Sequence, residues 1–468
     1  MKKTLLSALL FFSLLVTQLA TPAALAAEGD GAGTSSTVES MYIQAKAAIL
    51  VDDDYGEVLY EQNAHEKNYP ASITKVMTTL LVLEAVDRGE AALTDIVTVG
   101  DEVNLGIGEG GSGVGLKEGE QLSLEDLLYC ALTASANEAC NALAQYLCGD
   151  VATFVERMNQ RAAELGMENT HFANTHGYHD PDHYTTAYDI YLMCHEAMQN
   201  PTFRTIVSSV GHEVPATNMS EARSLHETNA LVSTWRIDNY WYRYATGIKT
   251  GSTPEAGYCL ASSATKNDRN LIAVVLGAEN PKNPDGSTNR LQFAESTRLL
   301  EMGFNDFSRQ TILDETDRDF PEVAVTLSSG ADYVTVQPSG ALEATLPNDI
   351  VMENFERKVD LPAEVEAPVE AGEKLGTVTL TYDGQEYGTL DLVTTASVER
   401  SELLYRLDRI QRFFDQLWVK IVLAVLAVLI VFLILRRLIL GRSRSRYGGG
   451  RRSGGYSGGR RYSGRRRR

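Results

Sequence analysis

Three short motifs stand in one order along this chain, and they constrain its fold more than any other feature. They are Ser72-Ile73-Thr74-Lys75, Ser135-Ala136-Asn137 and Lys249-Thr250-Gly251. Each of them occurs by chance in many proteins of this length. All three in this order are typical of a serine nucleophile that forms an acyl-enzyme. We therefore expect three distant segments to meet in one cleft.

The residues around the motifs narrow the assignment. Pro70 and Ala71 stand directly before Ser72, residues 158–189 end in HDPDHYTTAYD, and residues 247–258 read GIKTGSTPEAGY. In these segments the chain resembles the low-molecular-weight penicillin-binding proteins, which are serine-type D-alanyl-D-alanine carboxypeptidases. The resemblance extends from about residue 40 to about residue 400.

The resemblance implies a fold, a substrate and a class of inhibitors. The fold is an α/β (α+β) catalytic domain of the serine β-lactamase and penicillin-binding-protein type, followed by a small all-β domain. The implied substrates are peptidoglycan stem peptides that end in D-Ala-D-Ala, and β-lactam antibiotics would inhibit. Neither a cofactor nor a metal is expected. Local patterns independently favour an α/β sandwich with antiparallel strands, because helices are grouped between strands from both ends. The expected strands are residues 48–51, 58–59, 258–263 and 271–276, and the expected helices are residues 124–132, 138–147 and 151–165. Further on, residues 374–380 and 387–393 alternate apolar and polar side chains, and Asp383-Gly384 between them predicts a hairpin turn.

Ser72 is the expected nucleophile and Lys75 the expected base. One helical turn separates them, so the amine can reach the serine hydroxyl. To accept a proton at neutral pH, Lys75 must be partly neutral, and both burial and the second cation Lys249 would lower its pKa. By itself the first motif would predict only the solvated start of a helix. The presence of the other two motifs favours a catalytic role for Ser72 and Lys75.

The second and third motifs supply the remaining groups of the predicted site. Ser135 and Asn137 are expected on a tight loop between helices, where Ser135 relays a proton and Asn137 binds a substrate amide; helix capping is the alternative. Lys249 and Thr250 are expected on a strand at the edge of the cleft, where they hold the terminal carboxylate of the substrate. Gly251 lacks a side chain, so the substrate backbone can approach that strand.

Two further assignments depend on the resemblance. The backbone N–H groups of Ser72 and Ser252 would form the oxyanion hole. An arginine would bind the substrate carboxylate, and Arg290, before a helix expected at 293–300, is the candidate.

A histidine-rich loop resembles a metal site by content. Because the family has such a loop without a metal in its mechanism, we interpret these residues as structural: His171, His176, His179, Asp180, Asp182 and His183.

The predicted function is that of a D-Ala-D-Ala carboxypeptidase in cell-wall synthesis or remodelling. A D,D-endopeptidase or transpeptidase on the same wall substrate is the alternative, because the acyl-enzyme chemistry is shared. A β-lactamase also carries the three motifs, but class A enzymes need a Glu-x-x-Leu-Asn string that does not occur here. An inactive wall-binding scaffold is disfavoured because every expected catalytic side chain is present.

Both ends of the chain carry targeting signals. Lys2 and Lys3 precede an apolar run and the small residues 24–26, which is typical of a secretory signal peptide. Residues 417–435 hold a single charge, Lys420, and at ~1.5 Å per residue they would cross a hydrocarbon core of ~30 Å. The thirteen arginines from position 436 on, without an acidic residue, place the tail in the cytoplasm and the body outside.

The Arg/Gly-rich tail is expected to contact lipid headgroups, although it also resembles RNA-binding segments. No nucleic-acid partner is therefore expected. The predicted organisation is a signal peptide (1–26), a flexible lead-in (27–40), the catalytic domain (41–306), a β-rich domain (307–398), an amphipathic stalk (399–416), a transmembrane helix (417–437) and an Arg/Gly-rich cytoplasmic tail (438–468).

Overall fold

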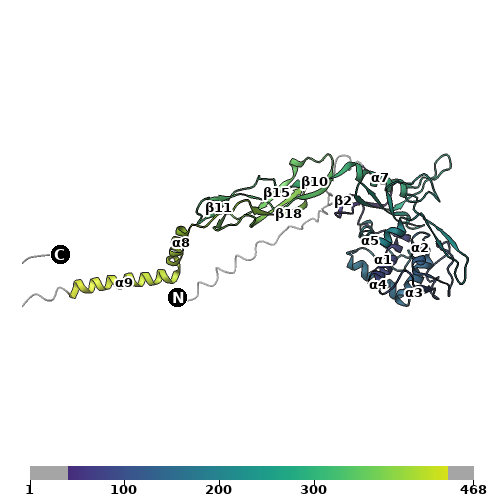
Figure 1. The fold of residues 1–468 in the computed structure, drawn as a ribbon, viewed down its shortest axis with the longest axis horizontal. Coiled ribbons are helices and arrows are strands. Elements are labelled where there is room, and N and C mark those ends of the chain that lie inside the picture. The colour runs from purple at the N-terminus through teal and green to yellow at the C-terminus, as the bar shows by residue number, and fades with distance from the viewer. Residues whose placement is uncertain (1–40, 441–468) are drawn as a thin grey trace, which may run out of the picture. The chain divides into compact units, whose positions relative to one another are not determined.

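The computed structural model of this chain describes residues 41–440 (Figure 1). Its central element is a five-stranded antiparallel sheet in the order β2-β1-β9-β8-β7, so that β7 is an edge strand. The strands are β1 (Ala47–Asp52), β2 (Glu57–Gln62), β7 (Ala245–Thr253), β8 (Gly257–Lys266) and β9 (Arg269–Ala278). The strands expected from the sequence in these regions are confirmed.

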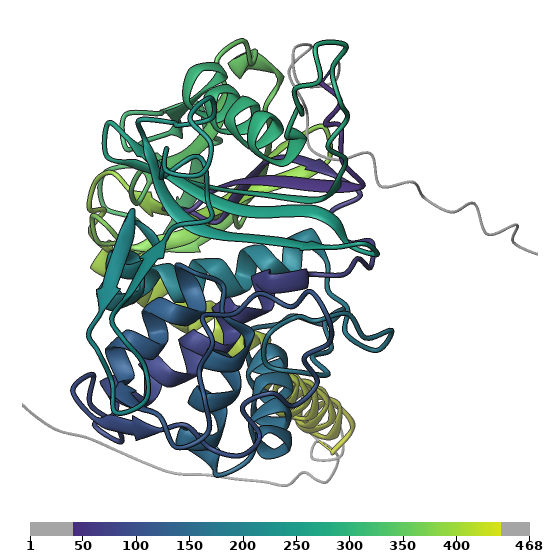
Figure 2. The ribbon, with the colours of Figure 1, turned by 90° about the vertical axis from the view of Figure 1, so that its right-hand side faces the viewer.

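Both faces of this sheet are buried, because successive side chains of a strand point to opposite sides. Ile49 and Val51 belong to one hydrophobic core, and Leu50 between them belongs to the other. Figure 2 shows helices on the two sides of the sheet. Burial on both faces explains why β1 and β9 read as continuous apolar runs.

Helices α1 to α6 lie on the face of the sheet that carries Ile49, and α7 packs against the face that carries Leu50. On the first side lie the short 3₁₀ turn η1 (Ala71–Thr74) and α1 (Lys75–Asp87), α2 (Leu124–Leu132), α3 (Asn137–Cys148), α4 (Val151–Glu164), α5 (Ala187–Gln199) and α6 (Pro201–Val207). On the second side lies α7 (Leu291–Asp306). Two small two-stranded antiparallel sheets also lie in this region: β3 (Ile96–Thr98) with β4 (Gln121–Ser123), and β5 (Gly211–Val214) with β6 (Arg223–His226).

Local capping explains where several helices begin. The side chains of Ser123, Asp150 and Thr186 accept hydrogen bonds from backbone N–H groups in the first turns of α2, α4 and α5. These caps satisfy donors that a helix start otherwise leaves without a partner. The predicted helix at 124–132 is confirmed at its exact bounds, and the prediction for 151–165 is confirmed to within one residue.

Beyond α7 the described chain is mostly β-structure until residue 400. The elements are β10 (Phe307–Leu313), β11 (Val323–Thr326), β12 (Tyr333–Val334), β13 (Val336–Pro338), β14 (Leu342–Pro347), η2 (Met352–Asn354), β15 (Glu356–Asp360), β16 (Glu364–Glu366), β17 (Lys374–Tyr382) and β18 (Gln385–Thr394). Asp383 and Gly384 join β17 to β18 with φ values of 47° and 82°, as the predicted hairpin turn requires.

The described residues form two compact units. One holds the residues up to Asp317 together with Pro338–Val359 and Thr377–Asp391, and the other holds Arg318–Gln337, Asp360–Gly376 and the residues from Leu392 on. Each unit is built from several separate stretches of the chain, so its limits do not correspond to single domain boundaries. The boundaries expected from the sequence, at residues 306 and 398, therefore stay predictions.

Two helices end the described chain, α8 (Glu402–Asp415) and α9 (Leu417–Leu440). Along α8 the apolar residues recur at helical spacing, as expected for the amphipathic segment. Among residues 41–440, one helix is long and apolar enough to cross a membrane, and it covers Leu417–Ile439. The predicted signal peptide, the lead-in and the tail from residue 441 on lie outside the described residues.

Candidate active site

The expected nucleophile, Ser72, lies on a tight turn that exposes its side chain; this turn is called the nucleophile turn. Ser72 is half-buried in η1, whereas Ile73, Thr74 and Lys75 after it are buried. Ala71 has a φ of 48°, in the left-handed region that L-residues rarely adopt. Such strained backbone is typical of functional sites, where the surrounding structure holds it in place. The turn directs the Ser72 hydroxyl out of an otherwise packed segment.

The amine of Lys75 lies within hydrogen-bond distance of three oxygens. Its Nζ atom is 2.8 Å from Ser72 Oγ, 2.7 Å from Asn137 Oδ1 and 2.8 Å from the carbonyl oxygen of His176. The amide and carbonyl oxygens can only accept, but a serine hydroxyl can also donate. A neutral amine therefore satisfies all three, donating to two oxygens and accepting the proton of Ser72. This geometry suits a general base.

Burial makes the neutral amine accessible near neutral pH. Lys75 is fully buried, and its pKa is lowered from 10.5 to about 7, chiefly by the loss of hydration. The positive charge of Lys249 contributes to this lowering, whereas Cys140 and Glu138 act in the opposite direction. The two causes expected from the sequence are both present, and burial is the larger.

The second motif joins α2 to α3. Ser135 is almost fully buried and has a φ of 60°, and Asn137 is the first residue of α3. The N–H of Asn137 donates to the carbonyl oxygen of Ser112 at 2.9 Å, which ties this start of α3 to a glycine-rich loop. Its side chain binds Lys75 at the same time. The structure thus brings the first two motifs into direct contact.

The third motif lies on β7, at the edge of the sheet, as expected. Gly251 faces the nucleophile turn: a Cβ atom there would lie 2.7 Å from the carbonyl oxygen of Pro70 and 3.1 Å from the N atom of Ser72. Both atoms belong to backbone and cannot move aside easily. The glycine therefore lets β7 pack against the turn of Ser72, a reason beyond the substrate access expected from the sequence.

Lys249 is fully buried on β7, and a buried acid faces it. Burial lowers the pKa of Lys249, and the carboxylate of Glu227 opposes that shift. Glu227 Oε1 accepts from the N–H groups of Thr228 and Asn229, at 2.8 Å each. The Oγ1 atom of Thr228 lies 2.7 Å from that of Thr250. Glu227 thus supports the third motif through its charge beside Lys249 and through Thr228, which contacts Thr250. No sequence pattern pointed to this residue.

The histidine-rich loop supports the nucleophile turn. His183 Nε2 lies 2.8 Å from Thr74 Oγ1, while its Nδ1 accepts from the N–H of Ala173 at 3.1 Å, so the fold uses both ring nitrogens. A Cβ atom at Gly177 would lie 1.8 Å from the carbonyl oxygen of Ala71. The loop therefore packs directly on η1, and the carbonyl oxygen of its His176 binds Lys75.

These elements enclose a cavity of about 270 Å³. Its lining includes Ser72 and Asn137, Ser252 near the end of β7, Glu255 just after that strand, and residues 109–112 of the glycine-rich loop. Ser252, next to Gly251 on β7, is exposed. A cavity with a serine, a buried amine beside it and an open strand edge is equipped for acyl transfer.

A family model described as D-alanyl-D-alanine carboxypeptidase matches residues 34–280, more than half of the chain. The chain belongs to this family. A second model, described as the C-terminal domain of penicillin-binding protein 5, matches residues 323–400. The serine-peptidase fold with a following β-rich region, as expected from the sequence, is thereby confirmed.

Curated relatives and solved structures agree with this membership. The D-alanyl-D-alanine carboxypeptidase DacF of Bacillus subtilis is 32% identical over 82% of this chain and 91% of its own length. DacC of Escherichia coli is 33% identical over 85% of this chain and 90% of its own. The crystal structure of penicillin-binding protein 6B from Escherichia coli superposes with a TM-score of 0.58 at 28% identity, covering 78% of this chain and 99% of that one.

One residue expected in this carboxypeptidase site is placed apart from the others. Arg290 is the residue before α7, and its backbone N–H donates to the hydroxyl of Tyr240 at 2.9 Å. It is not among the residues that line the cavity of Ser72. Its role as a carboxylate ligand stays a prediction.

Proposed function

We propose that this carboxypeptidase removes the terminal D-alanine from peptidoglycan stem pentapeptides through an acyl-enzyme on Ser72. The observation that carries the proposal is the position of the Lys75 amine, 2.8 Å from Ser72 Oγ and between two oxygens that can only accept. Family membership supports the substrate, because the curated relatives are named for this activity.

Acylation is the first half of the proposed reaction. Neutral Lys75 takes the proton of Ser72 while Oγ attacks the carbonyl carbon of the penultimate D-alanine. The N–H groups of Ser72 and Ser252 stabilise the negative charge that develops on the carbonyl oxygen. The protonated Lys75 then returns its proton, through the hydroxyl of Ser135, to the departing amine. D-Alanine leaves and the shortened peptide remains as an ester on Ser72.

Deacylation restores the enzyme. A water molecule attacks the ester carbonyl and gives up a proton to Lys75, and Ser72 recovers its proton as the tetrapeptide leaves. During both halves Asn137 would hold a substrate amide, while Lys249 and Thr250, with Arg290, would hold the carboxylate of the terminal D-alanine. A β-lactam attacked by the same serine would leave a slowly hydrolysed ester, so these antibiotics would inhibit.

The location follows from α9 and its flanks. Trp418 and Lys420 lie near the start of this apolar helix, where an aromatic ring and a long cationic side chain suit a membrane interface. Arg436 and Arg437 near its other end favour the cytoplasmic side. The protein would therefore cross the membrane once, with the catalytic region on the outer side and the Arg-rich C-terminus in the cytoplasm.

Release of D-alanine by the full-length protein in detergent tests this function. The substrate is a stem pentapeptide ending in D-Ala-D-Ala, and the variants are Ser72→Ala and, as a matched control at an exposed serine, Ser339→Ala. We expect the parent and the Ser339→Ala control to release D-alanine and the Ser72→Ala variant to release none. Labelling of Ser72 by a fluorescent penicillin without D-alanine release would favour a transpeptidase or endopeptidase. Neither release nor labelling would favour the inactive scaffold.

A further inference from the structure

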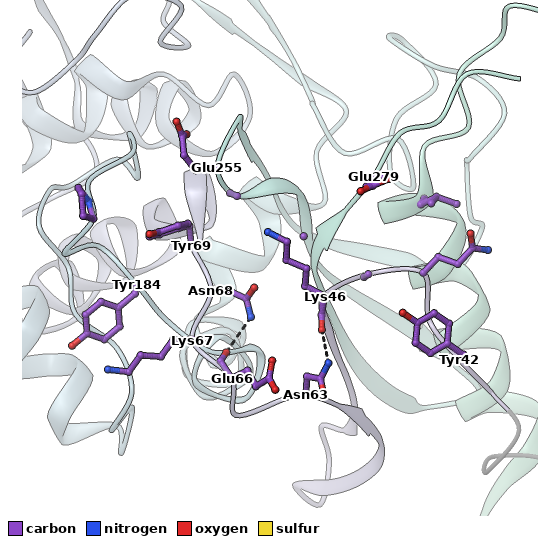
Figure 3. Close-up of a pocket in the computed structure, with 16 residues that line it drawn as sticks. Tyr42, Lys46, Asn63, Glu66, Lys67, Asn68, Tyr69, Tyr184, Glu255 and Glu279 are labelled. Carbon is purple, nitrogen blue, oxygen red and sulfur yellow. Dashed lines mark hydrogen bonds between the residues drawn. The ribbon is translucent and has the colours of Figure 1, made fainter.

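A second and larger cavity lies beside the cavity of Ser72, and Glu255 lines both. Its volume is about 920 Å³. Figure 3 shows its side chains. They come from the residues before β1, the segment that leads to the nucleophile turn, the histidine-rich loop, the turn between β7 and β8, the end of β9 with Glu279 after it, and the start of α7. Nothing in the proposed acyl-transfer chemistry uses this cavity.

Three side chains connect the two cavities. Tyr69, three residues before Ser72, lines the large cavity, and its ring is perpendicular to that of His179, with ring centroids 4.7 Å apart. His179 lines the cavity of Ser72, and its Nδ1 is 3.9 Å from Glu255 Oε2. One layer of side chains therefore forms the boundary, and a single extended ligand can reach both cavities.

The direction of the substrate decides which part would reach the large cavity. With its terminal carboxylate at Lys249 and Thr250 and its scissile carbonyl at Ser72, the peptide runs along the edge of β7. Its remaining N-terminal part then continues past Ser252 toward Glu255, at the far end of the strand. The large cavity consequently lies on the side of the stem that stays bound as the acyl group.

The charges of the large cavity are of both signs. Lys46 and Lys67 line it and are exposed. Lys67 Nζ lies 4.0 Å from the centre of the Tyr184 ring, and Lys46 extends across the middle of the cavity (Figure 3). Its acids are Glu66, Glu255 and Glu279. A ligand that carries both an amine and a carboxylate matches this lining.

We propose that the large cavity binds the side chain of the third stem residue, and that this residue is a diamino acid with a free carboxylate. The proposal rests on the proposed carboxypeptidase function. Lys46 and Lys67 bind the carboxylate of that side chain, and the acids of the cavity bind its amine. The cavity thus makes the enzyme selective among stem peptides, while the chemistry at Ser72 is the same for all of them.

The test compares three pentapeptides that differ only at the third residue, which is meso-diaminopimelate, lysine or alanine. For the full-length protein in detergent, kcat and KM of D-alanine release are measured for each. A charge-assisted contact in a partly open site is expected to raise kcat/KM for the diaminopimelate peptide roughly tenfold over the alanine peptide.

Variants separate the two kinds of charge. Lys46→Met and Lys67→Met keep the aliphatic stem and remove the ammonium group, so each should lower kcat/KM only for the diaminopimelate peptide. Glu279→Gln should lower it for both the diaminopimelate and the lysine peptide. Lys358→Met, at an exposed lysine of β15, is the matched control and should change none of the three values. Unchanged penicillin labelling of each variant shows that the site of Ser72 is intact.

The outcomes distinguish this inference from the function on which it rests. Release of D-alanine from all three peptides with equal kcat/KM overturns the selectivity and leaves the carboxypeptidase standing. A preference for the lysine peptide over the diaminopimelate peptide overturns the carboxylate contact. If no peptide releases D-alanine while penicillin still labels Ser72, the carboxypeptidase function itself fails, and this inference fails with it.

Discussion

Two regions of this molecule each hold a pair of lysines, and the pairs differ in depth. Lys75 and Lys249, around the nucleophile, are fully buried, whereas Lys46 and Lys67, in the neighbouring cavity, are exposed. Burial removes the hydration that stabilises an ammonium group, so the pKa of Lys75 falls to about 7. The same residue type is therefore proposed to accept a proton in the buried region and to bind a carboxylate in the exposed one.

The neighbours differ as well. Around Lys75 the oxygens are held by η1, by α3 and by the histidine-rich loop, so the amine has one geometry. Lys67 has an aromatic ring as neighbour, a contact that tolerates many orientations of the side chain. The buried region is thus suited to one reaction, and the exposed region to recognition of a charged ligand.

The largest effect is expected from Lys75→Arg. A guanidinium group stays protonated in proteins and cannot accept the proton of Ser72. Acylation by a fluorescent penicillin should slow on the order of 10³-fold, within the range of lost general-base catalysis. Lys67→Arg, the matched change in the exposed region, should alter the rate less than about twofold, as surface substitutions do. An acylation rate for Lys75→Arg within tenfold of the parent would contradict the role of base.

The next effect tests the packing of the buried region. Gly251→Ala places a Cβ atom against the backbone of Pro70 and Ser72. Because a displacement of the nucleophile by about 1 Å costs about 10²-fold, acylation by penicillin should fall by roughly that factor. Gly340→Ala is the control, since a Cβ atom there meets nothing within 4 Å. Equal rates for both variants would mean that the contact of β7 with the turn does not position Ser72.

The pH dependence of acylation compares the two regions directly. Lys75 must lose its proton to act as base, and its lowered pKa is about 7. The rate should therefore rise with pH through a midpoint near 7 and gain about tenfold between pH 6 and pH 8. Lys67→Met should leave this midpoint in place. A rate that keeps rising toward pH 10 would show that Lys75 has an ordinary lysine pKa.

The smallest effect is expected on stability in the exposed region. Lys67→Met removes the contact of the ammonium group with the Tyr184 ring, which at an exposed site stabilises by about 0.5–1 kcal/mol. Thermal unfolding of the full-length protein in detergent should show a correspondingly small decrease in Tm. A loss of several degrees would mean that Lys67 has a structural role, and that its charge is not free to bind a ligand.

Much of the architecture could be predicted from local patterns. Alternation along β17 and β18, with Asp383-Gly384 between them, was enough to predict the hairpin, and the apolar spacing of 124–132 was enough for α2. Strand and helix periods are properties of consecutive residues. The third motif likewise predicted the edge strand β7. The assignments of Ser72 as nucleophile and Lys75 as base stay predictions, and they could be made because each motif keeps its residues within a few positions of one another.

Other features depend on segments that are far apart in the sequence. The carbonyl oxygen of His176 binds Lys75, Glu227 faces Lys249, and Glu255 lines two cavities, yet none of these residues carries a signal of its own. From the sequence, the need for a glycine at position 251 could be explained only in part. Its contact with Pro70 joins β7 to a turn far earlier in the chain.

The sequence by itself determined the chemical groups, their order and the family to which the chain belongs. Only the tertiary structure decided how deeply each group is buried, and burial sets the charge of a lysine. That depth results from packing three segments and a supporting loop against one sheet, so it is a property of the whole fold. The difference between Lys75 and Lys67 exists only once the chain has folded.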